Sequence, residues 1–191
     1  FTYEAKSLPY PIDTSYYDNE KHTQADALSV IPFMDEMNYE GLSVSGLSDG
    51  YYGLTIGGEF IGRFTARELE RGINMALLQN TPQYKQAMKI RQMNEERWLK
   101  ERKMREFYWV EYNLMRKTGM LWACNEAAVD TLRKYRPHDI FLQWNGALWL
   151  QYMHKGIRED CVNEQQDLVN QIYEQNKPIP LQIEIKKFTD L

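Results

Sequence analysis

The chain has 191 residues, of which 43% are hydrophobic and 26% are charged, and this composition is typical of a globular protein. A chain of this length can bury a core without disulfides or metal ions, so it fits one domain or a compact two-part unit. The formal net charge of −4 argues against a general nucleic-acid-binding protein, and the absence of a run of about 18 apolar residues predicts no membrane span.

Residues 1–66 predict a small β unit. Residues 1–7 alternate weakly between apolar and polar side chains, which is typical of a strand, and residues 27–33 suggest a short strand or extended segment. The clearest signal is a hairpin. Its first strand places three apolar side chains on one face, namely Tyr52, Leu54 and Ile56. Gly57 and Gly58 then supply the positive φ that a two-residue hairpin turn requires.

A helix is predicted directly after this hairpin. Thr65 and Glu68 have the spacing of a capping box, in which each side chain bonds the backbone amide of the other residue. Apolar residues then follow at helical spacing, namely Leu69, Ile73 and Leu77. The pattern predicts that this helix ends near residues 79–80.

A much longer helix is predicted over about residues 82–118. Thr81 and Pro82 are a helix start signal, and Gly119 is a natural stop. The predicted helix has about 36 residues and a length of about 54 Å. Ten basic residues oppose five acidic ones within it, and we interpret this excess as a solvated face with i,i+4 ion pairs rather than as a nucleic-acid-binding helix.

The remaining chain predicts more helix and one last strand. Residues 125–135 predict a short helix, and residues 139–176 predict a helix broken at Gly146 or Gly156 that packs antiparallel on the long helix. Beyond Pro178, three apolar residues alternate with polar ones, namely Leu181, Ile183 and Ile185. This final segment is predicted to rejoin the N-terminal sheet.

Together these elements predict an α+β fold with a small antiparallel β-sheet closed by a C-terminal strand, plus a long antiparallel helical hairpin. The expected organisation is one compact unit built from three segments. These are the small β unit 1–66, the helical region 67–178 and the C-terminal strand segment 179–191.

The sequence assigns no catalytic, cofactor-binding or metal-ligating residue. The histidines His22, His138 and His154 lack helical metal-ligand spacing, and the glycines do not form a nucleotide-binding loop. Asp18 and His22 could serve as acid and base of a triad with a serine, whereas Ser48-Asp49-Gly50 has the wrong order for a hydrolase nucleophile motif. No cofactor is expected.

The two cysteines and the many aromatic residues each leave two interpretations open. Cys124 and Cys161 lie too far apart in sequence for a metal motif, so they are either plain thiols or a single disulfide formed in an oxidising compartment. The 13 Tyr, 5 Trp and 7 Phe residues either pack a core or an interface, or face a carbohydrate.

Three blocks of sequence carry a family resemblance. They are GLSDGYY with LTIGG (46–58), FTAREL with GINMA and TPQY (64–84), and IY with KPIP and IEI (172–185). In this order they resemble the C-terminal region of bacterial, Bacteroides-type SGNH/GDSL-type hydrolases. In that family a flavodoxin-like α/β catalytic domain precedes the region, which contributes a small β unit and long helices. Residues 120–165 match no motif of the family.

The resemblance implies that the nucleophile, the oxyanion groups and the Asp-x-x-His block lie upstream of residue 1, so no catalytic residue carries over to this chain. The expected role is an accessory C-terminal domain of an SGNH/GDSL-like ester hydrolase that braces the catalytic domain or shapes its entrance. Its expected partner is that catalytic domain, or another copy of this chain. The resemblance also implies a carbohydrate ester as substrate, a secreted or periplasmic location, and no activity of this chain alone.

Two other hypotheses stay open at this stage. A non-enzymatic carbohydrate-binding or protein-interaction module would use the Trp- and Tyr-rich helices and show a closed surface with a few exposed rings. A self-standing esterase would need Asp18, His22 and a serine within hydrogen-bond reach in a cleft. The accessory domain instead predicts a bare apolar face.

Overall fold

The structure is a computed structural model that describes residues 1–12 and 23–188. It divides the chain into two compact units. The sheet unit comprises Phe1–Arg91 and Glu174–Leu191, and the helical unit comprises Gln92–Tyr173. The segment boundaries that the sequence suggested, after residues 66 and 178, stay a prediction. The division between the two units falls inside two helices, after residue 91 and after residue 173.

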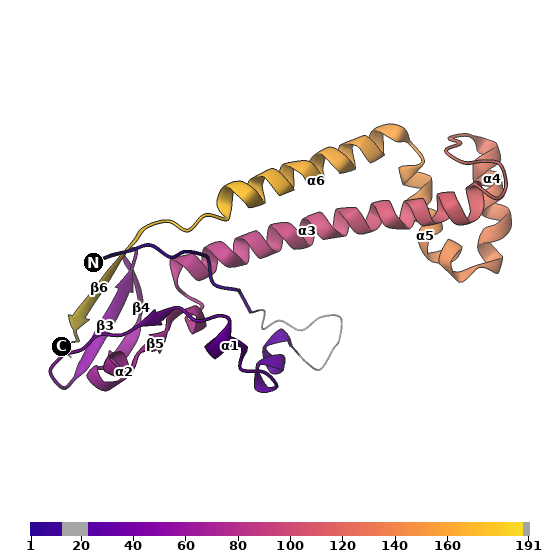
Figure 1. Cartoon of the computed structure of the whole chain (residues 1–191). Helices are drawn as coiled ribbons and strands as arrows, with labels where there is room; N and C mark the ends of the chain where they lie inside the picture. Colours follow the sequence, from indigo (N-terminus) through magenta and orange to yellow (C-terminus); the bar gives the residue numbers. More distant parts are fainter. Residues whose placement is uncertain (13–22, 189–191) are drawn as a thin grey trace. The chain divides into compact units, whose positions relative to one another are not determined.

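The sheet unit contains a four-stranded antiparallel sheet in the order β1-β6-β3-β4 (Figure 1). The strands are β1 Thr2–Tyr3, β3 Tyr51–Ile56, β4 Glu59–Thr65 and β6 Leu181–Lys187. The C-terminal strand β6 pairs with β3 on one side and with β1 on the other. The predicted α+β fold, with a sheet closed by the C-terminal strand, is therefore confirmed.

The alternating strand patterns explain why β6 joins this sheet. Leu54 pairs with Ile185, and Ile56 pairs with Ile183. Because side chains alternate between the faces of a strand, these residues share one face, where they bury a common core. Gly57 and Gly58 have φ of 59° and 84°, as the predicted hairpin turn requires.

The predicted extended segment at residues 27–33 is wrong. The structure has a 3-10 helix, η1 Gln24–Ser29, and a short helix, α1 Phe33–Glu36. The Thr23 amide donates a hydrogen bond of 2.7 Å to the Asp26 carboxylate. This capping contact starts a helical turn, and the apolar pattern alone did not show it.

The helix after the hairpin begins as predicted but ends early. The Glu68 amide donates to the Thr65 hydroxyl and the Thr65 amide donates to the Glu68 carboxylate, so the capping box is present. The helix α2 Ala66–Arg71 stops at Gly72, which has φ of 94°. Beyond it, β5 Ile73–Asn74 pairs with β2 Gly41–Leu42, and η2 Met75–Leu77 follows. The apolar spacing predicted a helix up to residues 79–80, but the pairing of β5 with β2 ends it at residue 71.

The long helix α3 Pro82–Val110 starts at the predicted residue. The Tyr84 amide donates a hydrogen bond of 3.3 Å to the Thr81 hydroxyl, which caps the helix. A π-helix, η3 Glu111–Met115, continues α3, and a turn leads to Gly119, which has φ of 72°. The helical backbone therefore ends three residues before the predicted residue 118.

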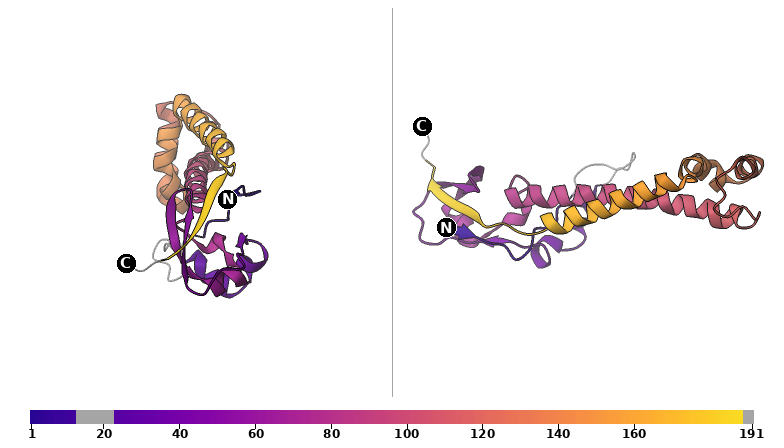
Figure 2. Two further views of the ribbon diagram at one scale, coloured as in Figure 1. Left: turned by 90° about the vertical axis from the view of Figure 1, so that its left-hand side faces the viewer. Right: turned by 90° about the horizontal axis from the view of Figure 1, so that it is seen from above.

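The second half of the helical unit turns back along α3. It contains α4 Glu126–Tyr135, the 3-10 turn η4 Arg136–His138, α5 Ile140–Tyr152 and α6 Lys155–Gln175. Figure 2 shows α6 running antiparallel beside α3, and the Lys100 ammonium contacts the Glu164 carboxylate at 2.7 Å between them. The predicted hairpin is confirmed. The break between α5 and α6 lies at residues 153–154 and not at either glycine.

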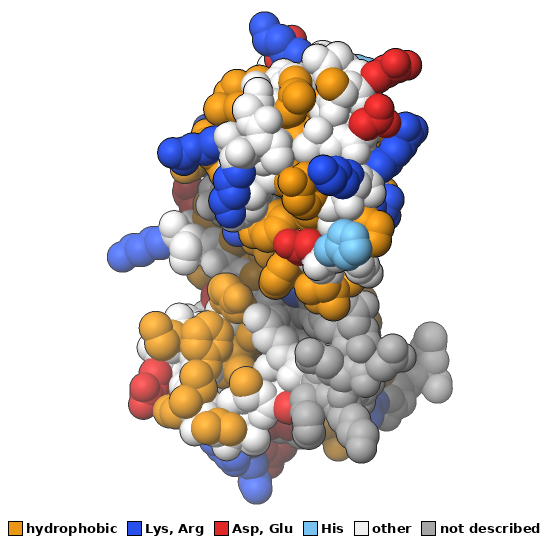
Figure 3. All heavy atoms as spheres, turned by 90° about the vertical axis from the view of Figure 1, so that its right-hand side faces the viewer, with side chains coloured by type: hydrophobic (Ala, Val, Ile, Leu, Met, Phe, Trp, Pro, Cys, Tyr) orange, Lys and Arg blue, Asp and Glu red, His pale blue; other side chains and the backbone are white. Residues whose placement is uncertain are grey.

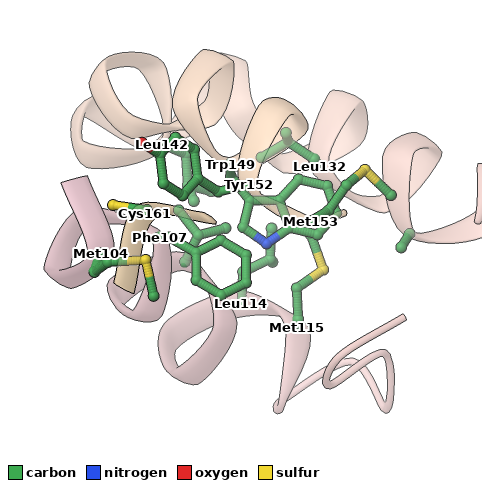
Figure 4. Packing of buried hydrophobic residues seen from close by; sticks show 12 residues of the cluster. Met104, Phe107, Leu114, Met115, Leu132, Leu142, Trp149, Tyr152, Met153 and Cys161 are labelled. Carbon is green, nitrogen blue, oxygen red and sulfur yellow. The ribbon is translucent and has the colours of Figure 1, made fainter. Parts of the chain in front are cut away.

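A single apolar cluster holds the helical unit together. Figure 4 shows this cluster, in which Phe107 and Trp149 are fully buried. Its buried members also include Met104, Val110, Leu114, Met115, Ala128, Leu132, Leu142, Tyr152, Met153 and Cys161. These side chains come from α3, η3, α4, α5 and α6, so the cluster fixes how these helices pack on one another.

Candidate functional site

The triad that the sequence suggested stays a prediction. Asp18 and His22 lie outside the described residues. His138 and His154 belong to the helical unit, on η4 and between α5 and α6. Within residues 1–12 and 23–188, no three His, Cys, Asp or Glu side chains gather in a way that could hold a metal ion.

Ser48 has polar partners, but they do not form a catalytic set. The Lys187 ammonium donates a hydrogen bond of 3.0 Å to the Ser48 hydroxyl, and the Tyr52 hydroxyl donates one of 3.0 Å to the Ser48 carbonyl. An ammonium group donates hydrogen bonds and cannot take the serine proton. Because Ser48 precedes β3 and Lys187 ends β6, this contact joins the turn to the C-terminal strand.

The two cysteines are free thiols in different surroundings. Cys124 is exposed, and its Sγ lies 3.3 Å from Nδ1 of His154. Cys161 is buried, and its thiol donates to the Lys100 carbonyl oxygen at 3.7 Å. Burial, together with a hydrogen bond to Cys161, raises the pKa of Tyr152 to about 12. The disulfide alternative does not hold in this structure.

A polar network lies inside the sheet unit around Glu40. The Tyr3 hydroxyl donates a hydrogen bond of 2.8 Å to the Glu40 carboxylate, and the Gln83 amide nitrogen lies 3.4 Å from its other oxygen. Burial, and then the contact with Glu40, raise the pKa of Tyr3 well above its usual value. The buried Gln83 Oε1 has no partner among the described residues, and a cavity of about 10 Å³ adjoins it.

A larger cleft, of about 360 Å³, opens in the helical unit. We call it the α3–α5 cleft, because its lining comes from the end of α3, from η3 and from the segment that leads into α5. Its apolar and aromatic lining residues are Trp109, Leu114, Tyr135 and Leu142. Its polar lining residues are Asn113, Lys117, Thr118, His138 and Asp139. This volume falls within the range of small-molecule sites, about 300–1,000 Å³.

The bonds made by three of these polar residues show which atoms remain for a ligand. The Asn113 amide nitrogen donates to the Trp109 carbonyl, and the Thr118 hydroxyl donates to the Leu114 carbonyl. One Asp139 oxygen caps α5 by accepting from the amides of residues 141 and 142. Each residue therefore keeps an acceptor oxygen beyond these bonds.

The surface of α5 beside this cleft is apolar and exposed. Ile140, Phe141 and Trp144 all lie open to solvent, and Trp144 is 65% exposed. The Phe141 ring packs 5.3 Å from Trp109 and 5.5 Å from Trp144. Figure 3 faces α4 and α5, where hydrophobic side chains lie among basic, acidic and other polar ones.

The α3–α5 cleft was not predicted, although the sequence carries one signal for it. Trp109, Asn113 and Lys117 follow each other at intervals of four residues, so a helix places them along one face. The other lining residues, from Tyr135 to Leu142, join them only through the tertiary packing.

No helix within the described part of the chain combines the length and the apolar composition needed to cross a lipid bilayer.

Comparisons with known proteins give two matches. Residues 88–177 match the family described as the diltiazem deacetylase C-terminal helical domain. A solved structure, that of a gut microbial diltiazem-metabolizing enzyme, superposes with a TM-score of 0.89 at 37% sequence identity over 98% of this chain. A search of curated proteins finds no match. This chain spans only 42% of that enzyme's chain. The helical region is therefore similar to the C-terminal helical domain of diltiazem deacetylase.

Proposed function

We propose that this chain is the accessory C-terminal part of a deacetylase-like ester hydrolase. One observation carries the proposal. Nearly the whole chain superposes on less than half of a diltiazem-metabolizing enzyme, and residues 88–177 match a domain described as C-terminal and helical. A segment similar to the C-terminal part of an enzyme is expected to work together with the rest of that enzyme.

The catalytic groups are then supplied by a partner region that precedes this chain. We propose that this region is an SGNH/GDSL-type domain, which the sequence blocks at residues 46–58 and 64–84 support. The reaction is hydrolysis of an acyl ester, an acetyl ester in the first instance and an acylated carbohydrate as one substrate class. A secreted or periplasmic location is part of the same proposal.

The apolar face of α5 suggests how the accessory part meets its partner. Ile140, Phe141 and Trp144 expose side chains that water solvates poorly, and Trp144 is exposed to 65%. Contiguous exposed apolar surface commonly marks a protein contact. We propose that this face packs against the catalytic region, bracing it or shaping its entrance. Another copy of this chain is the alternative occupant.

The test compares two proteins in p-nitrophenyl acetate hydrolysis. One is this 191-residue chain, and the other is the product of the whole open reading frame that encodes it. The proposal expects an active whole product and an inert chain. An inert whole product would favour a binding module without catalytic function.

Two variants distinguish the accessory role from the self-standing esterase hypothesis. If the 191-residue chain is active by itself, His22→Ala and Ser48→Ala should be measured separately. Loss of activity in either variant would overturn the accessory role. Ser45→Ala provides a matched control, because Ser45 is also exposed and lies three residues before Ser48.

A further inference from the structure

The α3–α5 cleft combines two kinds of surface in one site. Trp109 and Tyr135 contribute aromatic rings, and the buried Leu114 and Leu142 contribute apolar floor. The aromatic residues come from α3 and α4, so the ring surfaces belong to different helices. A ligand in this cleft therefore meets apolar surface from more than one direction.

Hydrogen-bonding groups of both kinds line the same cleft. Lys117 and His138 offer N–H donors. Asn113, Thr118 and Asp139 offer acceptor oxygens. Within the described part of the protein the Asn113 and Thr118 side chains only donate, and a single Asp139 oxygen accepts from the α5 amides. Donors and acceptors within one small cleft suit a ligand that carries several hydroxyl groups, since each hydroxyl both donates and accepts.

The charges of the cleft argue for a neutral ligand. Lys117 carries a positive charge and Asp139 a negative one, and both line the site. An anionic ligand would lie near the Asp139 carboxylate, and a cationic ligand would lie near the Lys117 ammonium. A charged ligand of either sign would therefore be attracted by one of these two side chains and repelled by the other.

We propose that the α3–α5 cleft binds a neutral sugar ring. A pyranose has an apolar C–H face that packs on an aromatic ring and an edge of hydroxyl groups that both donate and accept. These two features match the Trp109 and Tyr135 rings and the five polar residues of the cleft. The inference goes beyond the accessory role, because it assigns to the helical unit a binding site of its own.

The test measures binding and does not depend on hydrolysis. The protein is the product of the whole open reading frame, and ligand-observed saturation-transfer NMR reports which small molecules contact it. The probes are methyl β-glucopyranoside, methyl β-galactopyranoside and N-acetylglucosamine, with benzoate and glycerol as non-sugar controls. We expect saturation of at least one sugar with a Kd of about 1 mM, which is typical of a weak site.

Two tyrosine variants identify the site. Tyr135 lines the cleft and is 41% exposed, whereas Tyr108 lies outside the lining and is 39% exposed. Tyr135→Ala should weaken sugar binding about twofold to tenfold, since one aromatic contact contributes about 0.5–1.5 kcal/mol. Tyr108→Ala should leave it unchanged. Asn113→Ala should also weaken binding, because it removes an acceptor oxygen.

The outcomes separate this proposal from the accessory role. No saturation of any sugar, equal saturation of benzoate, or sugar binding that survives Tyr135→Ala and Asn113→Ala would each overturn the cleft assignment. None of these results bears on p-nitrophenyl acetate hydrolysis, which tests the accessory role alone. Circular dichroism of each variant checks that a loss of binding does not come from unfolding.

Discussion

The Glu111 carboxylate accepts a hydrogen bond of 2.8 Å from the indole nitrogen of Trp149, and only 1% of Glu111 is exposed. The other carboxylate oxygen accepts from the Trp122 amide at 2.8 Å. One buried side chain thus joins η3 to α5 and to the loop before α4. Trp122 has φ of 62°, a conformation that is unfavourable for a large side chain. The Glu111 contact holds this loop in place.

Glu111→Leu should destabilise the helical unit. The substitution places an apolar side chain of similar size at this buried position and leaves the Trp149 and Trp122 donors without their acceptor, and a buried unsatisfied donor such as the Trp149 indole costs about 1–3 kcal/mol. Urea unfolding measures the loss. Trp149→Phe removes one donor, so in that background Glu111→Leu should cost less than in the wild type. Equal costs in both backgrounds would contradict the proposed coupling.

Gln83→Met should leave the stability of the sheet unit nearly unchanged. Gln83 is 3% exposed, and its Oε1 has no partner among residues 1–12 and 23–188. Methionine fills a similar volume without a buried acceptor and gives up only the long 3.4 Å contact to Glu40, so we expect a change within about 0.5 kcal/mol in urea unfolding. Gln83→Ala, the size control, should cost clearly more because it leaves a cavity. A large loss in Gln83→Met would contradict this expectation, and would show that Gln83 is held by its contact with Glu40 or by a water bound beside Oε1.

The capping box of α2 should make stability depend on pH on the acid side. Hydrogen bonds from the Thr65 backbone amide, and then from its hydroxyl, lower the pKa of Glu68 below its ordinary value of 4.5. The folded state therefore binds this proton less readily than the unfolded state. The contribution is fully present above about pH 4.5 and disappears as pH falls through the lowered pKa.

Thermal unfolding from pH 7 to pH 3 tests this dependence. The difference in Tm between wild type and Glu68→Gln should shrink as the pH falls, because glutamine does not titrate. Glu70→Gln is the matched control, since Glu70 lies on the same helix and is also exposed. A Tm difference that stays constant over this pH range would be inconsistent with the lowered pKa.

The thiols should differ in reactivity. Cys124 is exposed and Cys161 is buried, so N-ethylmaleimide should add once to the native protein and twice after denaturation without reductant. Intact mass spectrometry counts the additions, and Cys124→Ser should abolish the native one. If the denatured protein takes up reagent only after reduction, the two cysteines form a disulfide.

Local signals in the sequence were sufficient for many elements. The Gly57-Gly58 turn, the Thr65 capping box and the start of α3 at Pro82 all occur where predicted. The C-terminal strand was also predicted, because alternating apolar residues can bury only one face of a strand. In each case the interactions that form the element lie within a short stretch of the chain.

Other features depended on partners that are distant in sequence. The apolar spacing after Thr65 predicted a helix up to residues 79–80. In the structure β5 instead pairs with β2, and the paired residues Leu42 and Ile73 are 31 positions apart in the sequence. The α3–α5 cleft likewise brings Trp109 and Lys117 next to residues 135–142. Spacing in the sequence cannot show which helix packs beside which.

The sequence by itself determined the fold class, the helix start signals and the resemblance to a hydrolase C-terminal region. The tertiary structure decided the division into two units, the cleft lining and the exposed face of α5. The physical reason is the distance along the chain over which each interaction acts. Capping, turn formation and strand alternation act within a few residues, whereas burial and cleft formation depend on which distant surfaces exclude water from one another.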